Sequence, residues 1–508
     1  MGVGPRVVVM KSSQGEMGVG FRESMGWGDV GLFGGAWISQ RPGSRYALVA
    51  LFALFALFAL LVMAGGPAGA ADLDSTPTAD EATPDEATAD ESTAGDGTAD
   101  DRKADDRTAD ERIAALEEQV KILAAELSAE RVAVAVPEDS EFDPVWGVGP
   151  SASKVYRQDG GLSIGGYGEV RFQHDPKKDD IFDALRAVLY VGYKFSDKWL
   201  LNSEFEFEHG GQSNVYVEFL NLDYLHSEAL NFRVGLILLP MGFVNQLHEP
   251  TFYYGASRPE VELTIIPTTW RENGAGFFGR LNSRITYQVY AVTSLQGKKF
   301  NASGFRGGRQ KGFKSLANDW SFVFRTDFEA ARGLDLGASV YYGNQGQGQE
   351  LENIKVGSLT TTIYEIHAEY KLHGITARAL FSQAFVDNPN ALNAGIEKIT
   401  PMVSTGYLAE TLLGGYVEVA YDVLPLLLPE TRMSLEPFFR YERLDTQASM
   451  QGDTYARSLE FDQHIYTTGL QYKPIPQVVF KLDYRRAVQE SGGALLSEQV
   501  QFGAGYVF

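Results

Sequence analysis

The chain has 508 residues and a formal charge of −22, because 66 Asp and Glu residues outnumber 44 Lys and Arg residues. This acidic balance leaves no basic face for releasing phosphate counterions, which excludes general electrostatic binding of nucleic acid. The absence of cysteine excludes disulfides, thiolate metal sites, iron–sulfur clusters and thiol catalysis. Together, 54 glycines and 12% aromatic residues in a chain of alternating segments are typical of an all-β protein with many turns.

Residues 1–71 are predicted to be a leader extension followed by a secretory signal peptide. An uncharged apolar core, YALVALFALFALFALLVM, lies between a basic flank and the small-residue segment AGGPAGAA. Small residues at Ala68 and Ala70 suit a signal peptidase, whereas an uncleaved membrane anchor is the alternative for an apolar core of this length. We assign no function to residues 1–40.

Three further segments precede the regular part of the chain. Residues 72–110 are repetitive Thr, Ala, Asp and Glu, which cannot bury enough apolar surface to offset ordering entropy, so a disordered acidic spacer is expected. Residues 111–133 carry apolar side chains at alternating spacings of three and four, which predicts a short coiled coil completed by partner chains; a surface helix is the alternative. A linker is expected over 134–160, and this acidic N-terminal region is not expected to plug a barrel.

From Leu162 onward, stretches of residues alternate apolar and polar side chains with period two, separated by turn residues. Trp320 and Phe322, for example, alternate with Ser321 and charged neighbours. Strand 214–226 is ambiguous, because its polar residues fall in phase with its apolar ones. The sixteen predicted strands lie at 162–173, 182–195, 199–209, 214–226, 230–241, 273–281, 285–295, 319–330, 334–345, 360–372, 375–386, 411–423, 432–446, 461–473, 477–488 and 496–508.

The connections alternate between tight turns and long loops. Those at 196–198 and 373–374 are short, whereas those at 242–272 and 387–410 exceed twenty residues. Short turns at one end of the strands and long loops at the other are typical of an outer-membrane barrel. A closed sheet also leaves no unpaired strand edge in lipid. A soluble sandwich is the alternative. The predicted fold class is all-β, a sixteen-stranded antiparallel transmembrane β-barrel over 161–508.

The apolar face of each strand is predicted to face lipid, and the charged face to line a lumen that is too wide for side chains to fill and is therefore expected to hold water. The predicted lumen-lining residues are Glu169, Arg171, Arg186, Glu204, Glu206, Arg233, Arg325, Asp327, Glu365, Glu369, Arg378, Arg440, Lys481 and Arg485.

No catalytic signature appears in the sequence: P-loop, G-x-S-x-G and H-E-x-x-H motifs are absent, so neither an enzyme nor a cofactor is predicted. Glu365, His367 and Glu369 share one strand face and have the residue types of a divalent-ion site, but charges paired across strands are the preferred interpretation and no metal is predicted. An outer-membrane barrel enzyme such as a lipid hydrolase, and a barrel adhesin or envelope anchor, are the alternative functions.

Two long loops carry candidate functional residues. The loop 242–272 is longer than a surface connection needs and is too apolar for solvent, so its aromatic residues should pack on the barrel wall. Its charged residues are then candidates for a constriction, unless the loop covers a trimer contact: Glu249, Arg258, Glu260, Glu262 and Arg271. The next long loop carries six basic residues and no acid, which would attract anions at the mouth or contact lipopolysaccharide phosphate: Lys298, Lys299, Arg306, Arg309, Lys311 and Lys314.

The segments FRVGLILLPMGFVNQLHEPTFYYGASRPEVE and IIPTTWRENGAGFFG, with the heptad segment and the barrel, resemble the phosphate-selective porin O and P superfamily of outer-membrane porins over about residues 110–508. The resemblance implies a homotrimer with an inward-folded third loop, passive diffusion of small hydrophilic solutes or ions, and a periplasmic coiled coil. The mixed lumen charges depart from the basic ladder of phosphate-selective members, so only weak anion preference is expected. The ending VQFGAGYVF is similar to the signal that barrel assembly machinery reads at a C-terminal aromatic, here Phe508.

Overall fold

The computed structural model describes residues 118–121, 144–211, 214–399, 406–429 and 431–508. The predicted leader, signal peptide and acidic spacer lie outside the described residues. So does the predicted coiled coil, apart from four helical residues. In the described part of the chain, no helix combines the length and apolar character needed to cross a bilayer.

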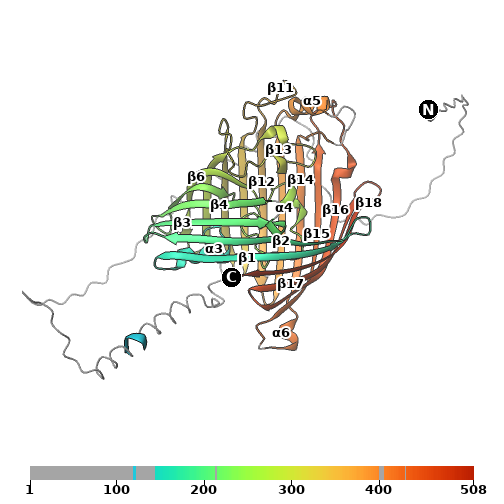
Figure 1. The fold of residues 1–508 in the computed structure, drawn as a ribbon. Coiled ribbons are helices and arrows are strands. Elements are labelled where there is room, and N and C mark those ends of the chain that lie inside the picture. The colour runs from blue at the N-terminus through green and yellow to red at the C-terminus, as the bar shows by residue number, and fades with distance from the viewer. Residues whose placement is uncertain (1–117, 122–143, 212–213, 400–405, 430) are drawn as a thin grey trace, which may run out of the picture. The chain divides into compact units, whose positions relative to one another are not determined.

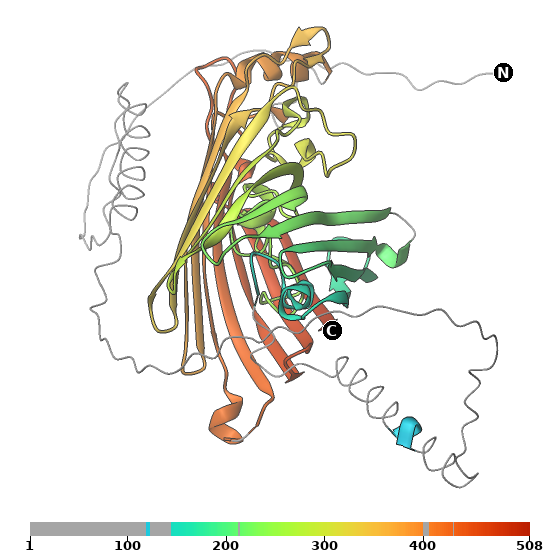
Figure 2. The same ribbon diagram turned by 90° about the vertical axis from the view of Figure 1, so that its left-hand side faces the viewer.

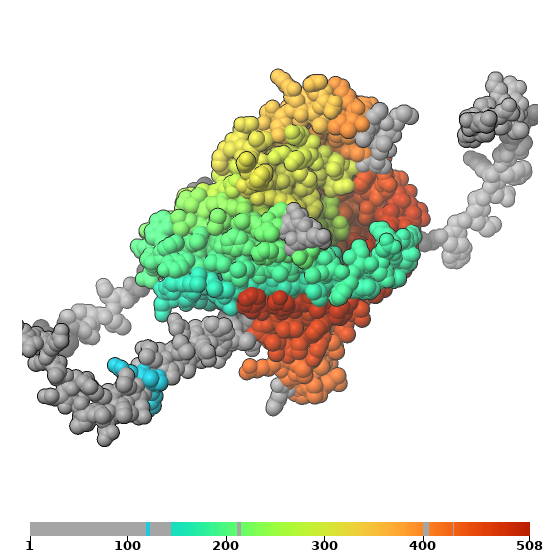
Figure 3. Space-filling model, viewed as in Figure 1, coloured from blue at the N-terminus to red at the C-terminus, as the bar shows by residue number. Residues whose placement is uncertain are grey.

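Within the described residues, sixteen strands close into one antiparallel barrel, which confirms the predicted fold class. The barrel closes where β1 (Gly161–His174) pairs with β18 (Leu495–Val507), and Figure 3 shows these first and last strands side by side. The other strands, shown in Figure 1, are β2 (Ile181–Lys194), β3 (Trp199–Glu208), β4 (Asn214–Leu225), β5 (Asn231–Leu238), β6 (Arg271–Asn282), β7 (Ile285–Thr293), β8 (Trp320–Ala331), β9 (Leu334–Asn344), β12 (Thr360–Leu372), β13 (Ile375–Val386), β14 (Thr411–Tyr421), β15 (Ser434–Ser449), β16 (Asp462–Ile475) and β17 (Val478–Gln489).

Helices and a small hairpin decorate the connections. The α5 helix (Pro389–Ile399) and the hairpin of β10 (Glu350–Leu351) and β11 (Ile354–Lys355) lie at one end of the barrel, and α6 (Leu424–Leu427) lies at the opposite end (Figures 1 and 2). The first end carries the long loops and the second the short turns. The remaining short elements are α3 (Pro150–Arg157), α4 (Glu260–Thr264), η2 (His209–Gly211), η3 (Gly297–Lys299), η4 (Arg306–Gly308) and η6 (Leu459–Phe461).

The barrel turns its apolar side chains outward and its charged side chains inward. On β12, Ile366 is 57% exposed, whereas the adjacent Glu365 and His367 are buried. Phe322 and Leu482 are exposed on the outer face in the same way. Since a continuous apolar exterior needs an apolar solvent, this inversion of the usual burial pattern is that of a barrel surrounded by lipid.

The ambiguous strand β4 contains a β-bulge, in which Glu218 is an extra residue opposite β3. One extra residue reverses the alternation of side chains. Val215 is exposed before the bulge, and Leu220 is exposed after it while Asp223 is buried inside. The bulge therefore explains why polar and apolar residues of this strand share one sequence phase.

Aromatic side chains gather where the strands end. Beside a short turn, the rings of Trp199 and Tyr224 lie 4.8 Å apart and those of Tyr193 and Phe195 lie 5.0 Å apart. At the long-loop end, Trp320 is 51% exposed. These positions suit the lipid headgroup level, where amphipathic rings are favoured.

Ile366→Arg is expected to lower the free energy of unfolding by about 2–4 kcal/mol, because it places a charge in the middle of the lipid-facing side of β12. Ile375→Arg is the matched control: this residue begins β13 beside a short turn, and the expected cost is about 0–1 kcal/mol. Urea unfolding of protein folded in phospholipid vesicles measures both values. Equal costs would contradict a depth-dependent hydrocarbon environment around the barrel.

Residues 144–158 differ from the linker predicted over 134–160. They lie inside the barrel, where α3 packs against β1, β2 and β3. Val148 and Ala152 are buried in a cluster with Tyr167 and Val188 of the wall. The expectation that no part of the N-terminal region enters the barrel is thus wrong for this stretch, because a helix of two turns is too short to reveal its apolar face as a periodicity.

Candidate functional site

The connection between β5 and β6, residues 239–270, folds into the barrel and spans its interior. Lys481 Nζ on β17 donates a hydrogen bond to the carbonyl oxygen of Tyr253 at 2.7 Å. Across the ring of strands, Arg325 Nη1 on β8 donates to the carbonyl oxygen of Gly242 at 2.5 Å. The inward-folded third loop predicted from the sequence is therefore present; we call residues 239–270 the inner loop.

The inner loop forms an apolar cluster with the wall. Ile265, Ile266 and Trp270 are fully buried, as expected, together with Tyr341 and Leu412 of the wall. A lumen filled by water alone is consequently not what the structure shows. Part of the interior is a packed core, which holds the inner loop in a defined position.

Two of the predicted constriction residues are instead structural. Glu262 is fully buried and accepts hydrogen bonds from the backbone N–H of Val244 at 2.8 Å and from the Tyr416 hydroxyl at 2.7 Å. Arg271 is buried at the start of β6, where its Nη1 lies 2.7 Å from the Glu218 carboxylate. Neither side chain faces open space, because the loop turns them toward the wall.

The other three predicted constriction residues have different surroundings. Glu260 is partly exposed and pairs with Arg485 at 2.9 Å. The guanidinium carbon of Arg258 lies 5.9 Å from the centre of the Tyr253 ring. Glu249 is buried, with its carboxylate against Gly149 before α3. Of the five predicted residues, Arg258 thus lines the polar cavity described below, and Glu260 is partly exposed beside Arg485.

A polar cavity of about 180 Å³ lies between the inner loop and β1, β2 and β3, and we call it the eyelet cavity. Four arginines and three glutamates line it, beside Tyr253 and Ser257: Arg171, Arg186, Arg258, Arg306, Glu169, Glu206 and Glu208. The mixture of charges and the enclosed volume suit hydrated ions and small polar solutes.

Arginines carry unsatisfied donors beside this cavity. Arg186 lies 3.3 Å from Glu169 and 3.8 Å from Glu206. The Nε atoms of Arg186 and Arg258 have no hydrogen-bond acceptor among the described residues. Tyr253 donates to both Glu169 oxygens, at 3.2 and 3.1 Å, which occupies acceptor sites of that carboxylate. Within the described residues, the wall of the eyelet cavity therefore offers hydrogen-bond donors that no acid satisfies.

All predicted lumen-lining residues lie on the inner face of the barrel, but most are buried in ion pairs because the inner loop covers them. Arg378 pairs with Glu369 at 2.7 Å. Arg440, fully buried, pairs with Glu418 at 3.0 Å and with Glu442 at 2.9 Å. These charges therefore hold the interior together as much as they line a passage.

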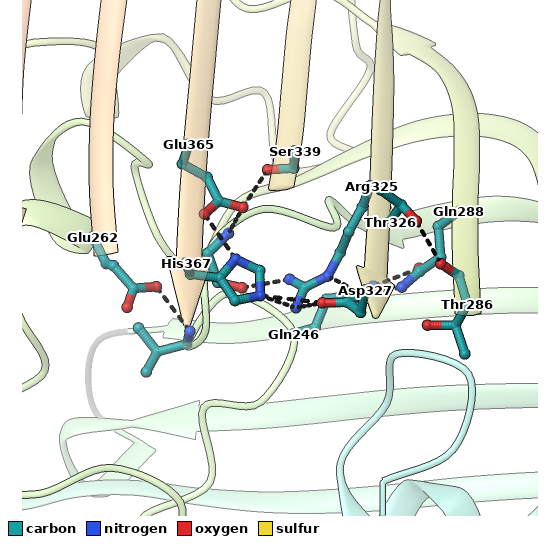
Figure 4. A network of polar contacts seen from close by, with 12 residues as sticks. Gln246, Glu262, Thr286, Gln288, Arg325, Thr326, Asp327, Ser339, Glu365 and His367 are labelled. Carbon is teal, nitrogen blue, oxygen red and sulfur yellow. Dashed lines mark hydrogen bonds and ion pairs between the residues drawn. The ribbon is translucent and has the colours of Figure 1, made fainter. Parts of the chain in front are cut away.

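His367 is the centre of a network that joins the wall to the inner loop (Figure 4). Its Nδ1 lies 2.9 Å from Glu365 and its Nε2 lies 3.1 Å from Asp327, which Arg325 also contacts at 2.8 Å. The backbone N–H of Gly242 donates to Glu365 at 3.3 Å. Across the described residues, no cluster of His, Asp and Glu side chains has the arrangement of a metal site.

The external basic loop is folded onto the inner loop. Arg309 donates to the carbonyl oxygens of Pro267 at 3.1 Å and Thr269 at 2.6 Å, and Arg306 donates to that of Thr268. Burial, followed by the charges of Arg306 and Arg271, lowers the pKa of Arg309 to about 9.

The other basic residues of the external loop have separate positions. Lys311 Nζ lies 4.6 Å from the centre of the Tyr216 ring. Lys298 and Lys299 form part of η3, and Lys314 is exposed. The six charges predicted to act together at the mouth are thus divided between the inner loop, the β4 wall and solvent.

Several lumenal acids were missing from the predicted set. Glu418 and Glu442 lie in strict alternation with their neighbours, so the alternation itself could have identified them. Glu218 and Asp223 could not be placed from alternation alone, because the bulge in β4 changes the phase between them.

No family model matches the chain. An uncharacterized protein of Aquifex aeolicus (strain VF5) is 35% identical over 370 residues, which cover 70% of this chain and 82% of that protein. The chain belongs to the family of this Aquifex protein.

Similar solved structures are outer-membrane proteins of low sequence identity. OmpF of Salmonella typhi in complex with daunomycin is 12% identical with a TM-score of 0.47, covering 68% of this chain and 97% of its own. An anion-selective porin from Comamonas acidovorans is 12% identical with a TM-score of 0.43, covering 69% and 100%. The loop L8 deletion mutant of OmpT from Vibrio cholerae is 14% identical with a TM-score of 0.44 and the same coverage.

Raising the pH from 5 to 9 is expected to loosen the inner loop. Burial raises the pKa of Glu262 to about 7, and burial and the Glu204 carboxylate raise that of Glu249 to about 8. Because these pKa values are higher in the folded state than in the unfolded state, stability falls as pH rises from about 4.5 through the folded values.

Hydrogen exchange across the inner loop, corrected for its intrinsic pH dependence, measures this effect. Protection should fall by at least about tenfold over this range, since a pKa that differs by one between two states changes the equilibrium tenfold. Glu249→Gln and Glu262→Gln should flatten the dependence, and the partly exposed Glu260→Gln should leave it unchanged. If protection falls equally steeply with pH in all three variants, Glu249 and Glu262 are not the groups that loosen the inner loop.

Proposed function

We propose that the protein is an outer-membrane porin through which small hydrophilic solutes and ions diffuse passively. The observation that carries the proposal is the inverted burial of a closed barrel: Ile366 and its outer-face neighbours are exposed, while Glu365 and the other lumenal charges are enclosed. A structure of this kind is suited to lipid outside and polar contents inside.

The mechanism is size-limited diffusion past the inner loop, biased by fixed charges and without a chemical step. The eyelet cavity lies where the inner loop approaches β1 to β3, so a solute there contacts Arg171, Arg258 and Glu208. Outer-membrane barrels have short turns on the periplasmic side and long loops on the external side. The short turns of this barrel therefore face the periplasm, and its long loops and external basic residues face the exterior.

The same proposal includes a homotrimer, a periplasmic coiled coil over 111–133, and assembly through the C-terminal segment ending at Phe508. Lipid covers the outer face, and lipopolysaccharide contacts the basic external loop. Within the porins, the resemblance noted above favours the phosphate-selective porin O and P superfamily. Heptad spacing supports the trimer, and the exposed apolar wall supports the lipid contacts.

Swelling of vesicles that contain the purified protein tests solute passage. Vesicles should swell rapidly in small sugars and progressively more slowly as sugar size increases, because the inner loop restricts the lumen. Empty vesicles are the control. If protein that is folded in the vesicles transmits no sugar or ion, the porin proposal is wrong.

Ion preference is expected to be weakly anionic at low salt and to fade at high salt, as screening shortens to about 10 Å at 0.1 M. The reversal potential across a potassium chloride gradient measures it. Arg171→Gln with Arg258→Gln should shift the potential toward cations, and changing Lys298, Lys299 and Lys314 to glutamine should have a smaller effect. Clear cation selectivity of the native pore would contradict the assignment.

A further inference from the structure

Residues 144–158, which we call the plug segment, occupy the short-turn end of the lumen. The Ser151 hydroxyl donates to the carbonyl oxygen of Gly166 at 3.3 Å and to that of Phe508. Asn202 Nδ2 on β3 donates to the carbonyl oxygen of Ala152 at 2.9 Å. The segment therefore binds the inner wall next to the line where β1 meets β18.

A single wall residue holds the plug segment at both ends. Arg233 is 1% exposed, and its Nε and Nη2 each donate to Asp223 at 2.9 Å. Its Nη2 also donates to the Tyr156 hydroxyl at 2.8 Å, and its Nη1 donates to the carbonyl oxygen of Trp146 at 3.2 Å. Arg233 and Asp223, which we call the clamp, thus fix both the start of the plug segment and the end of α3.

The plug segment also contacts the inner loop directly. A Cβ added to Gly147 would lie 2.5 Å from the Gln246 amide, and one added to Gly149 would lie 2.3 Å from a Glu249 oxygen. Glycine at both positions permits this close approach. Any displacement of the plug segment would consequently leave the inner loop without support on that side.

The contacts that hold the segment are both polar and apolar, and space remains beside it. Val148 and Val155 are buried against the wall, and a cavity of about 210 Å³ lies between Trp146, Phe243, Gln246 and the β7 and β8 wall. Release of the segment breaks these local contacts but none of the strand pairing that closes the barrel, so the segment is easier to release than the barrel is to open.

We propose that residues 144–158 are a lumenal plug that narrows the pore at the short-turn end and is held there by the Arg233 and Asp223 clamp. Release of the plug widens the passage and removes support from the inner loop. The proposal rests on the proposed porin function, and it makes the chain segment before β1 a determinant of conductance.

Deleting residues 144–157 from the full chain tests the plug through single-channel conductance, which should rise roughly twofold because conductance follows the open cross-section. The double variant Arg233→Met with Asp223→Asn removes both charges together and should produce the same rise. Arg332→Gln, at an exposed short turn, is the matched control and should conduct like the native protein. Native conductance in both the folded deletion and the clamp variant would overturn the plug.

A reversible disulfide between the plug segment and β2 tests the plug even if the deletion variant does not fold. A Cβ at Gly192 would lie 2.8 Å from the Val155 Cβ, which is about 1 Å closer than in a typical disulfide, so a small shift of α3 away from β2 gives the bonding distance. The native chain contains no cysteine. Val155→Cys and Gly192→Cys are added to the clamp variant. The conductance should equal the native value when the disulfide is formed and should rise again when the disulfide is reduced. Equal conductance in the oxidised and reduced states would refute the plug, whereas a native protein without conductance would refute the porin proposal itself.

Discussion

Deletion of residues 250–266 is expected to raise single-channel conductance several-fold. This part of the inner loop crosses the lumen, lies against the eyelet cavity and contributes Ile265 and Ile266 to the interior cluster. Its removal should widen the passage, because the lumen of a sixteen-stranded barrel is too wide for the side chains of the wall to fill. Recordings in planar bilayers give the change directly.

The matched control removes residues 350–355, the hairpin of β10 and β11. This hairpin is a separate two-stranded sheet and not part of the barrel wall. Its removal should leave the conductance close to the native value. If the variant that lacks 250–266 folds as a heat-modifiable barrel and conducts like the native protein, the inner loop does not form the constriction.

Arg440→Met is expected to lower the free energy of unfolding by about 3–5 kcal/mol, because it leaves the buried Glu442 without its ion-pair partner and Glu418 with only Arg378, 3.7 Å away. Arg440 also donates to the carbonyl oxygens of Tyr254 and Ser257, both at 3.1 Å. The variant should therefore expose the inner loop to hydrogen exchange as well. Urea unfolding in vesicles measures the stability change.

Arg443→Met on the same strand is the matched control. Arg443 is 46% exposed at the side chain and pairs with Asp462 at 3.2 Å, so its loss should cost about 0–1 kcal/mol. Changing Glu418 and Glu442 to glutamine in the Arg440→Met variant should recover much of the lost stability. Similar costs for the two arginine variants would show that the buried ion pairs do not hold the inner loop.

The strands were predictable because lipid and water impose opposite demands on the two faces of each strand. Ile366 beside His367 is sufficient to assign the outer and inner faces of β12. The same rule failed in β4, since Glu218 adds one residue and reverses the phase. Alternation therefore identifies faces well until a bulge intervenes.

The candidate site was less predictable, because its contacts join residues far apart in sequence. The length and apolar character of the inner loop predicted that it would fold inward, but not that Glu262 would turn toward Tyr416 on the wall. Nor could local sequence place Arg306 beside Thr268. Such pairings depend on the path of a loop, which has no periodic pattern.

Single-channel recording of the purified protein in a planar bilayer tests directly whether the barrel is an open pore for ions. Samples should first be shown to be folded by heat-modifiable migration on gels. We expect discrete conductance steps that increase with salt concentration, because ions cross a polar passage beside the inner loop. Folded protein that inserts into the bilayer without producing such steps would contradict the porin proposal.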